Sequence, residues 1–171
     1  PTEDNQVSRS IQTSYKKKGV DLKLKTLVEK ITVAGDGNVI VNFNDGTQES
    51  YSKVLSAGGR KVNIKDNGIE EIGIELINGK FIKINDYMQT SIPGIYAIGD
   101  ITGKMMLAHA AVTQGIAAVS HIAGNVQEID YSAIPSAIFT SPEIASLGDR
   151  EQDLKSNNIS YKVSRFSFAA N

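Results

Sequence analysis

The sequence predicts an α/β protein made of incomplete α+β pieces, with a β-meander in its first third. A helical segment is followed by short alternating strands, and an apolar segment later ends in Gly99-Asp100 ahead of an alanine-rich helix. The chain has 171 residues, of which 40% are hydrophobic and 22% charged, a composition typical of globular proteins. Shifts in composition divide it into three blocks, residues 1–60, 61–130 and 131–171.

The first block begins with a predicted helix over residues 5–18. Apolar residues recur every four positions there, at Val7, Ile11 and Tyr15, and Gly19 follows as a stop signal. Alternating apolar residues then predict strands at residues 20–24, 27–33, 39–43, 47–51 and 53–57. Because Asp-Gly pairs at 36–37 and 45–46 are turn signals, three of these strands are expected to form a meander.

The second and third blocks alternate helices with shorter strands. Residues 61–80 are loop-like, and strands are expected at 81–84 and, buried, at 95–98. Residues 106–123 have a helical period and are rich in Ala, which predicts a buried helix that ends at Gly124. Beyond residue 131 we expect strands at 137–139, 144–147 and 161–166, and a short helix at 151–156.

The end of the predicted strand at 95–98 is the strongest candidate for a binding site. Its Gly99-Asp100 pair places a carboxylate at a sheet edge, where α/β folds bind nucleotides and their hydroxyl groups. Gly99 leaves room for a ligand near the backbone, and a helix that begins near Ala108 directs free N–H groups toward the same edge. These residues suit a polyol joined to a group that becomes anionic. The alternative is that Asp100 only caps a turn.

Composition excludes several classes of function. Lys and Arg total 18 and Asp and Glu total 19, which gives no electrostatic basis for binding nucleic acid or an anionic membrane. Nowhere do 18 apolar residues run together, so we expect no membrane span. The chain has no Cys, and His109 and His121 stand too far apart for typical metal-ligand spacing. No disulfide, thiolate nucleophile or metal site is therefore expected.

Segments along essentially the whole chain carry a resemblance to a known family. Ile95–Asp100 together with Met106–His109 resembles the second flavin-binding motif of the pyridine nucleotide–disulfide oxidoreductases. The Met-Leu-Ala-His segment is similar to the branch of that family that oxidises dihydrolipoamide, whereas glutathione reductases usually carry Leu-Thr-Pro at this place. Residues 134–148 resemble the opening of the family's C-terminal dimerisation domain.

This resemblance implies partial FAD/NAD(P)-binding Rossmann-like domains. Residues 1–60 would be the latter half of the NAD-binding domain, residues 61–130 the second part of the FAD-binding domain, and residues 131–171 the start of the α+β dimerisation domain. FAD and NAD are the implied cofactors. Asp100 would bind the ribityl chain of FAD, and Met106, Leu107, Ala108 and His109 would present backbone to the flavin's pyrimidine edge.

The family also implies contacts with the pyridine nucleotide. Gly59 would lie against the nicotinamide nucleotide, and Val28 would line its adenine end through the backbone. Two alternatives remain open: Val28 is a core residue of its strand, and Gly58-Gly59 is a tight turn that leaves the sheet. His121 matches no role in the family, and we interpret it as a structural residue.

Catalysis in this family needs a redox Cys pair and a His–Glu pair, and this chain carries neither. The resemblance therefore implies a central to C-terminal fragment, which by itself would be inactive and free of cofactor. The parent would oxidise dihydrolipoamide with NAD, as a homodimer partnered by the lipoyl domain of the acyltransferase in 2-oxo acid dehydrogenase complexes. Its expected location is the bacterial cytoplasm or an organelle matrix. Alternatives are a glutathione or mercuric reductase, or a non-catalytic binding module of the same fold.

Overall fold

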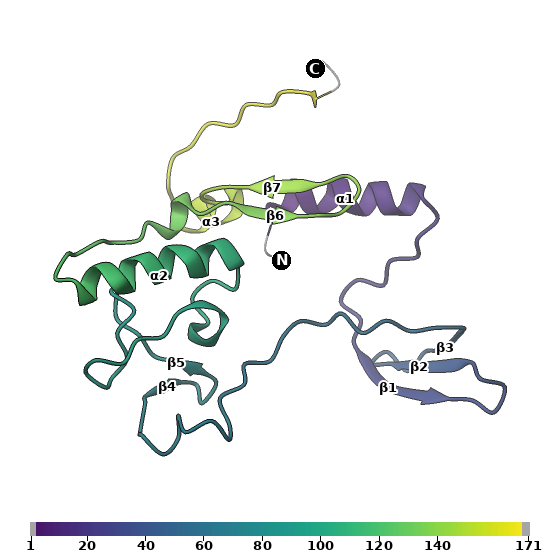
Figure 1. The fold of residues 1–171 in the computed structure, drawn as a ribbon. Coiled ribbons are helices and arrows are strands. Elements are labelled where there is room, and N and C mark those ends of the chain that lie inside the picture. The colour runs from purple at the N-terminus through teal and green to yellow at the C-terminus, as the bar shows by residue number, and fades with distance from the viewer. Residues whose placement is uncertain (1–2, 169–171) are drawn as a thin grey trace. The chain divides into compact units, whose positions relative to one another are not determined.

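The structure is a computed structural model that describes residues 3–168 (Figure 1). The chain divides into two compact units. One unit comprises Ser8–Arg60, and the other combines the residues up to Val7 with those from Lys61 onward. The predicted first helix is confirmed as α1 (Asn5–Lys17), which ends in Lys16 and Lys17. Positively charged side chains in the last turn stabilise a helix, because they are attracted to the negative end of its dipole.

The Ser8–Arg60 unit contains the predicted meander. Strands β1 (Val28–Val33), β2 (Val39–Phe43) and β3 (Gln48–Tyr51) form one antiparallel sheet in the order β1-β2-β3. Its two Asp-Gly turns close through backbone hydrogen bonds, including Phe43 N–H to the Thr47 carbonyl at 2.9 Å. Val41 and Phe43 on the central strand are buried, whereas all of β1 is exposed. The core of this unit is therefore one face of β2.

Two strands predicted in this unit are wrong. Residues 20–24 and 53–57 have no strand conformation among the described residues. Alternating apolar residues favour an extended backbone, but a strand exists only where a neighbour supplies the ladder of hydrogen bonds. Neither segment pairs with the sheet, which contains β1, β2 and β3 only. Both segments have the alternating apolar pattern of a strand, but neither has a neighbouring strand to pair with in the described part of the chain.

The other unit begins with a hairpin that the sequence only half reveals. The strand predicted at 81–84 is present as β5 (Phe81–Ile82), and its partner β4 (Leu76–Ile77) lies in the segment predicted as loop. Three residues, 78–80, connect the paired residues Ile77 and Phe81. Asn78 and Gly79 both have positive φ, of 53° and 64°, and the Lys80 N–H donates to the Ile77 carbonyl at 3.0 Å, which closes a tight turn. Behind this hairpin lies a small core formed by Ile74, Ile82 and Ala97.

The buried strand predicted at 95–98 is also wrong. This segment makes one isolated antiparallel bridge, between Gln89 and Tyr96, and Ile98 is exposed. Backbone hydrogen bonds from Thr90 N–H to the Ile95 carbonyl and from Ala97 N–H to the Met88 carbonyl hold it in place. It is extended but lacks the neighbouring strands that would make it part of a sheet.

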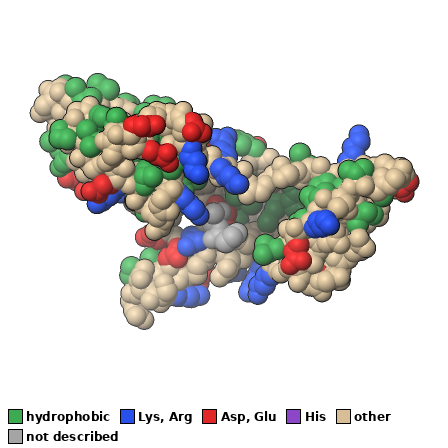
Figure 2. All heavy atoms as spheres, turned by 90° about the horizontal axis from the view of Figure 1, so that it is seen from below, with side chains coloured by type: hydrophobic (Ala, Val, Ile, Leu, Met, Phe, Trp, Pro, Cys, Tyr) green, Lys and Arg blue, Asp and Glu red, His purple; other side chains and the backbone are tan. Residues whose placement is uncertain are grey.

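The Ala-rich helix is confirmed as α2 (Ala108–Ile122), but it is buried along one side only. The residues that face inward share a helical spacing: Ala110, Gln114, Ala117 and Ala118. The opposite side exposes a second set of apolar residues: Val112, Ile116, Val119 and Ile122. Figure 2 shows exposed hydrophobic side chains among charged ones on the face it presents. The predicted burial of this helix is therefore confirmed for its alanine side and wrong for the opposite side.

The chain after α2 forms a second hairpin and a short helix, as predicted. Strands β6 (Ser136–Ile138) and β7 (Ile144–Ser146) pair antiparallel, and α3 (Glu151–Ser156) follows. Asp4 connects α3 to the start of α1, because its carboxylate accepts hydrogen bonds from the backbone N–H groups of Gln6 (2.9 Å) and Glu151 (3.0 Å). The last predicted strand is wrong, since residues 161–166 have no regular structure. Among the described residues, no helix has the length and apolar character needed to cross a membrane.

Candidate functional site

The site is built around the tight turn at Gly99. A short 3-10 helix, η1 (Gly99–Thr102), begins directly after the extended residue Ile98. Gly99 has a φ of +77°, a conformation that glycine adopts without the steric penalty of other residues. It is also buried, and a Cβ placed on it would lie 3.4 Å from the Cβ of Ala111 in α2. The turn and the helix thus approach each other closely at Gly99.

Gln114 fastens this turn to α2. Its side chain is fully buried, and its Oε1 accepts a hydrogen bond from the Gly99 N–H at 2.6 Å. Its Nε2 donates to the Tyr131 hydroxyl at 3.1 Å. The oxygen and the nitrogen of this buried amide thus each have a hydrogen-bond partner. A buried polar group stabilises a fold only when its hydrogen bonds are made in this way.

Sequence reasoning missed Gln114, although a signal exists. The inward face of α2 is otherwise alanine, so a polar residue in that stripe needs a buried partner. The periodic pattern of the helix marks such a residue as unusual, but it does not identify the partner. In the structure Gln114 holds Gly99, and with it the adjacent Asp100.

The first turn of α2 lies next to the same place. Met106 and Ala108 are exposed, and Leu107, the N-cap residue, offers no side-chain hydrogen bond to the helix. The first N–H groups of a helix need partners from outside it, and they carry the positive end of its dipole. This end of α2 is therefore suited to an acceptor or an anionic group.

His109 is oriented by a contact with the following segment. Its Nε2 lies 2.7 Å from the carbonyl oxygen of Pro135, just before β6. Since a carbonyl only accepts hydrogen bonds, Nε2 must carry the hydrogen. The start of α2 is thereby tied to the start of the β6–β7 hairpin.

The predicted site residues fall into two groups. Gly99, Asp100 and the segment from Met106 to His109 lie in one unit, at the junction of η1 and α2. Gly59 and Val28 belong to the Ser8–Arg60 unit. Gly59 is exposed and has a φ of +114°. A Cβ placed on it would have no atom within 4 Å, so glycine is needed there for its backbone conformation and not for lack of space.

Val28 is 52% exposed, which makes its interpretation as a core residue wrong.

His121, interpreted from the sequence as structural, has structural contacts. Its Nδ1 is hydrogen-bonded to the Tyr96 hydroxyl at 2.7 Å. The Tyr87 ring stacks on it with centroids 4.9 Å apart. These contacts attach the last turn of α2 to the loop that precedes Gly99.

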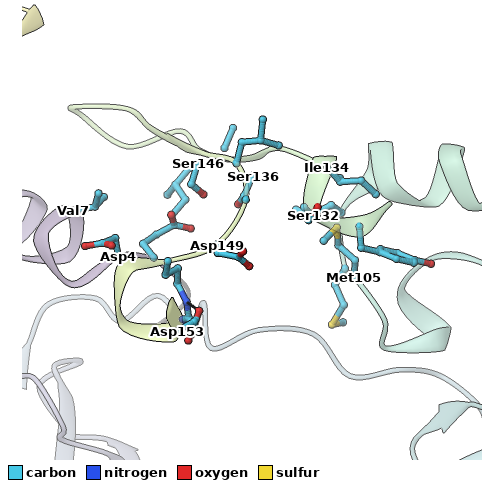
Figure 3. A pocket seen from close by; sticks show the side chains of 18 residues that line it. Asp4, Val7, Met105, Ser132, Ile134, Ser136, Ser146, Asp149 and Asp153 are labelled. Atoms are coloured by element: carbon cyan, nitrogen blue, oxygen red, sulfur yellow. Dashed lines mark hydrogen bonds and ion pairs between the residues drawn. The ribbon is translucent and has the colours of Figure 1, made fainter. Parts of the chain in front are cut away.

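A cavity of about 550 Å³ opens beside the start of α2 (Figure 3). Met106 and Leu107 form part of its wall, and Asp4, Asp149 and Asp153 lie elsewhere around it. The pKa of Asp4 is lowered from its ordinary value, chiefly by the backbone hydrogen bond from Gln6 and then by that from Glu151. Among the described residues, no cluster of three or more His, Cys, Asp or Glu side chains could hold a metal ion.

Comparison with known proteins identifies relatives along almost the whole chain. The pyridine nucleotide-disulphide oxidoreductase family matches residues 1–115, and the family's dimerisation domain matches residues 134–171. The mitochondrial dihydrolipoyl dehydrogenase of Sus scrofa is 42% identical over 98% of this chain and 34% of its own length. The dihydrolipoyl dehydrogenase of Mycobacterium leprae is 38% identical over 100% of this chain and 38% of its own length. The chain thus spans little more than a third of the length of these relatives.

Solved structures support the fold. LpdA from Mycobacterium tuberculosis superposes with a TM-score of 0.85 at 30% identity, over 94% of this chain and 35% of that one. The HOCl-induced flavoprotein disulfide reductase RclA from Escherichia coli gives 0.81 at 23% identity, over 92% of this chain and 36% of that one, a likeness of fold alone. The predicted fold class is confirmed, and the chain belongs to the pyridine nucleotide-disulphide oxidoreductase family.

Proposed function

We propose that this chain is the part of a dihydrolipoyl dehydrogenase that binds one edge of the flavin in FAD. The observation that carries the proposal is the attachment of Gly99 to α2 through Gln114, at 2.6 Å. This bond holds Gly99, which directly precedes Asp100, against α2, and Gly99 also lies close to Ala111 in the first turns of the helix. The N-cap residue of that helix, Leu107, gives its N-terminus no side-chain partner. A carboxylate acceptor beside the backbone donors of a helix end fits a polyol joined to a ring that gains negative charge.

Each residue of this junction has a distinct proposed role. The carboxylate of Asp100 accepts hydrogen bonds from hydroxyl groups of the ribityl chain, and Gly99 allows that chain to approach the backbone. The backbone from Met106 to His109 donates toward the pyrimidine edge, where the dipole of α2 stabilises negative charge. When bound, FAD supplies the electron transfer between a disulfide and NAD. His109 keeps this backbone in place through its bond to Pro135.

The other unit is proposed to contact NAD. Gly59 is exposed, so a nicotinamide nucleotide has access to its backbone. Val28 is also exposed, at the start of an edge strand, as backbone contact with an adenine group would require. We therefore retain residues 1–60 as NAD-binding, 61–130 as FAD-binding and 131–171 as dimerisation segments.

The complete reaction requires residues outside this chain. The chain has no Cys, so the exchange of electrons with dihydrolipoamide needs a thiol pair from elsewhere in the protein. Relatives named dihydrolipoyl dehydrogenase, at about 40% identity, support this reaction over that of a glutathione or mercuric reductase. We further propose a homodimer that receives electrons from a lipoyl domain in 2-oxo acid dehydrogenase complexes, in the bacterial cytoplasm or an organelle matrix.

The test is flavin binding by the longer protein that contains this chain. Asp100→Ala should weaken FAD binding by roughly tenfold or more, the loss expected for a hydrogen bond to a charged group. Asp86→Ala is the matched control, because Asp86 is an exposed carboxylate on a loop of the same unit. An unchanged dissociation constant for FAD in Asp100→Ala would contradict the assignment. Turnover with glutathione but not dihydrolipoamide would instead contradict the proposed substrate.

A further inference from the structure

Tyr131 begins the segment proposed for dimerisation, yet its side chain contacts the elements of the proposed flavin site. It opens η2 (Tyr131–Ala133), a short 3-10 helix, and it is half-buried. Its hydroxyl accepts a hydrogen bond from Nε2 of Gln114 at 3.1 Å. Because Oε1 of the same amide accepts from the Gly99 N–H, a single side chain joins the hydroxyl to the turn that carries Asp100.

The same hydroxyl reaches the residues before Gly99 by a second route. It donates a weak hydrogen bond to the sulfur of Met88 at 3.9 Å, and the Met88 side chain is fully buried. The Met88 carbonyl in turn accepts from the Ala97 N–H at 3.0 Å. Met88 has a φ of +66°, a conformation that persists in a residue other than glycine only where the surrounding contacts hold it. One hydroxyl thus supports both partners of the segment 97–99.

The ring of Tyr131 contacts the chain on the other side of Asp100. The ammonium group of Lys104 lies 5.1 Å from the ring centroid, within the range of a cation–π interaction. Lys104 stands between η1 and the Met106–His109 backbone that is proposed to face the flavin. Tyr131 therefore holds the chain both before and after the Asp100 carboxylate.

We propose that Tyr131 is a positioning residue for the flavin-binding turn. Its hydroxyl keeps the buried Gln114 amide directed at Gly99, because without this acceptor the amide nitrogen loses a partner and the amide is less firmly held. Tyr131 acts through Gln114 and not by contact with the cofactor. The inference rests on the proposed function, since it assigns a further residue to the same FAD site.

The experiment compares Tyr131→Phe with Tyr161→Phe in the longer protein that contains this chain. Phenylalanine keeps the ring and removes only the hydroxyl. Tyr161 is a matched control, because it is also half-buried and its hydroxyl donates to Glu151 at 2.8 Å. The ammonium group of Lys155 lies 6.0 Å from the Tyr161 ring centroid, so the control also retains a cation over its ring.

Two measurements separate positioning from a merely structural role. Tyr131→Phe should raise the dissociation constant for FAD by roughly three- to tenfold, the range of one hydrogen bond, and should shift the visible absorption spectrum of the bound flavin. In the protein freed of FAD, amide hydrogen exchange should become faster at Gly99. Tyr161→Phe should change none of these quantities.

A double-mutant cycle tests the route through Gln114. In a Gln114→Ala background, Tyr131→Phe should cause no further loss of FAD affinity, because residues that act as one unit are not additive. A full additional loss would overturn the proposed route. If Tyr131→Phe does not fold by circular dichroism, Met88→Leu takes its place, because leucine keeps the buried volume but offers the hydroxyl no sulfur. Exchange at Ala97 should then become faster, and unchanged exchange would count against the proposal.

The remaining outcomes distinguish this inference from the proposed function. Asp100→Ala is measured alongside. If Asp100→Ala weakens FAD binding while a folded Tyr131→Phe leaves both the dissociation constant and the flavin spectrum unchanged, Tyr131 is structural and only this inference fails. The same conclusion follows if Tyr161→Phe weakens FAD binding as much as Tyr131→Phe does. If neither Asp100→Ala nor Tyr131→Phe changes FAD binding, the proposed function fails and this inference fails with it.

Discussion

The backbone N–H of Gly99 and the side-chain oxygen of Gln114 are joined by a hydrogen bond of 2.6 Å across fifteen positions of sequence. This bond connects a tight turn that carries Asp100 to a helix whose N-terminus lies at the same site. The same amide reaches Tyr131, whose hydroxyl also lies 3.9 Å from the sulfur of Met88. One buried side chain thus sets the relation between the carboxylate and the backbone donors of the proposed flavin site.

Gln114→Ala should destabilise the protein by roughly 1–3 kcal/mol, because it leaves the buried Gly99 N–H without an acceptor. The measurement is urea unfolding followed by circular dichroism. Gln6→Ala on α1 is the control, because Gln6 is exposed and its side chain can be removed without opening a buried space. Equal midpoints for the two variants would mean that the Gln114 amide does not fasten the turn.

Gly103→Ala should be more destabilising than Gly94→Ala. Both glycines have positive φ, +65° and +80°, so each substitution costs roughly 1–2 kcal/mol of backbone strain. A Cβ on Gly103 would also lie 2.5–2.9 Å from the ring of Phe81, whereas nothing lies within 4 Å of one on Gly94. Thermal unfolding of the two variants measures the difference. Similar melting temperatures would show that Phe81 moves aside without cost.

The Asp4 carboxylate should contribute to stability at neutral pH and lose this contribution in acid. Hydrogen bonds from the Gln6 and Glu151 backbones lower its pKa below the ordinary value of 3.8. A depressed pKa in the folded state stabilises the protein above the unfolded-state pKa, and the effect disappears as the pH falls through the folded-state pKa. The stability difference between the protein and Asp4→Asn should therefore be largest at pH 7 and shrink below pH of about 4. Urea unfolding across this pH range tests the sign, and a difference that grows in acid would contradict it.

His109→Phe should loosen the connection between α2 and the β6–β7 hairpin. Phenylalanine keeps a ring at this position but cannot donate to the Pro135 carbonyl, which lies 2.7 Å from Nε2. Amide hydrogen exchange should become faster at Ser136 and Ile138 in β6. Exchange in β1–β3, which belong to the other unit, serves as the internal reference. Unaltered protection of β6 would show that the hairpin does not depend on His109.

Local signals are sufficient for the elements that depend on short-range interactions. Helix α1, the turns at 36–37 and 45–46 and the short helix α3 all form where spacing, Asp-Gly pairs and stop residues indicate them. The Gly99-Asp100 turn is also predictable, because a glycine before an acidic residue at the end of an apolar segment favours a sharp change of direction. These features are set within a few residues of backbone.

The tertiary structure alone decided which extended segments became strands and which apolar residues were buried. Residues 20–24, 53–57 and 95–98 have strand-like patterns, yet among the described residues none belongs to a sheet, and Tyr96 makes only an isolated bridge to Gln89, because pairing depends on distant segments. The same holds for Val28, apolar but exposed, and for Glu3, charged but buried. The sequence determined the family motif, which includes Asp100. The link from Gln114 to Gly99 and the unpaired oxygen of Glu3 emerged only when segments far apart in sequence were packed together, since burial and hydrogen-bond partners are properties of that packing.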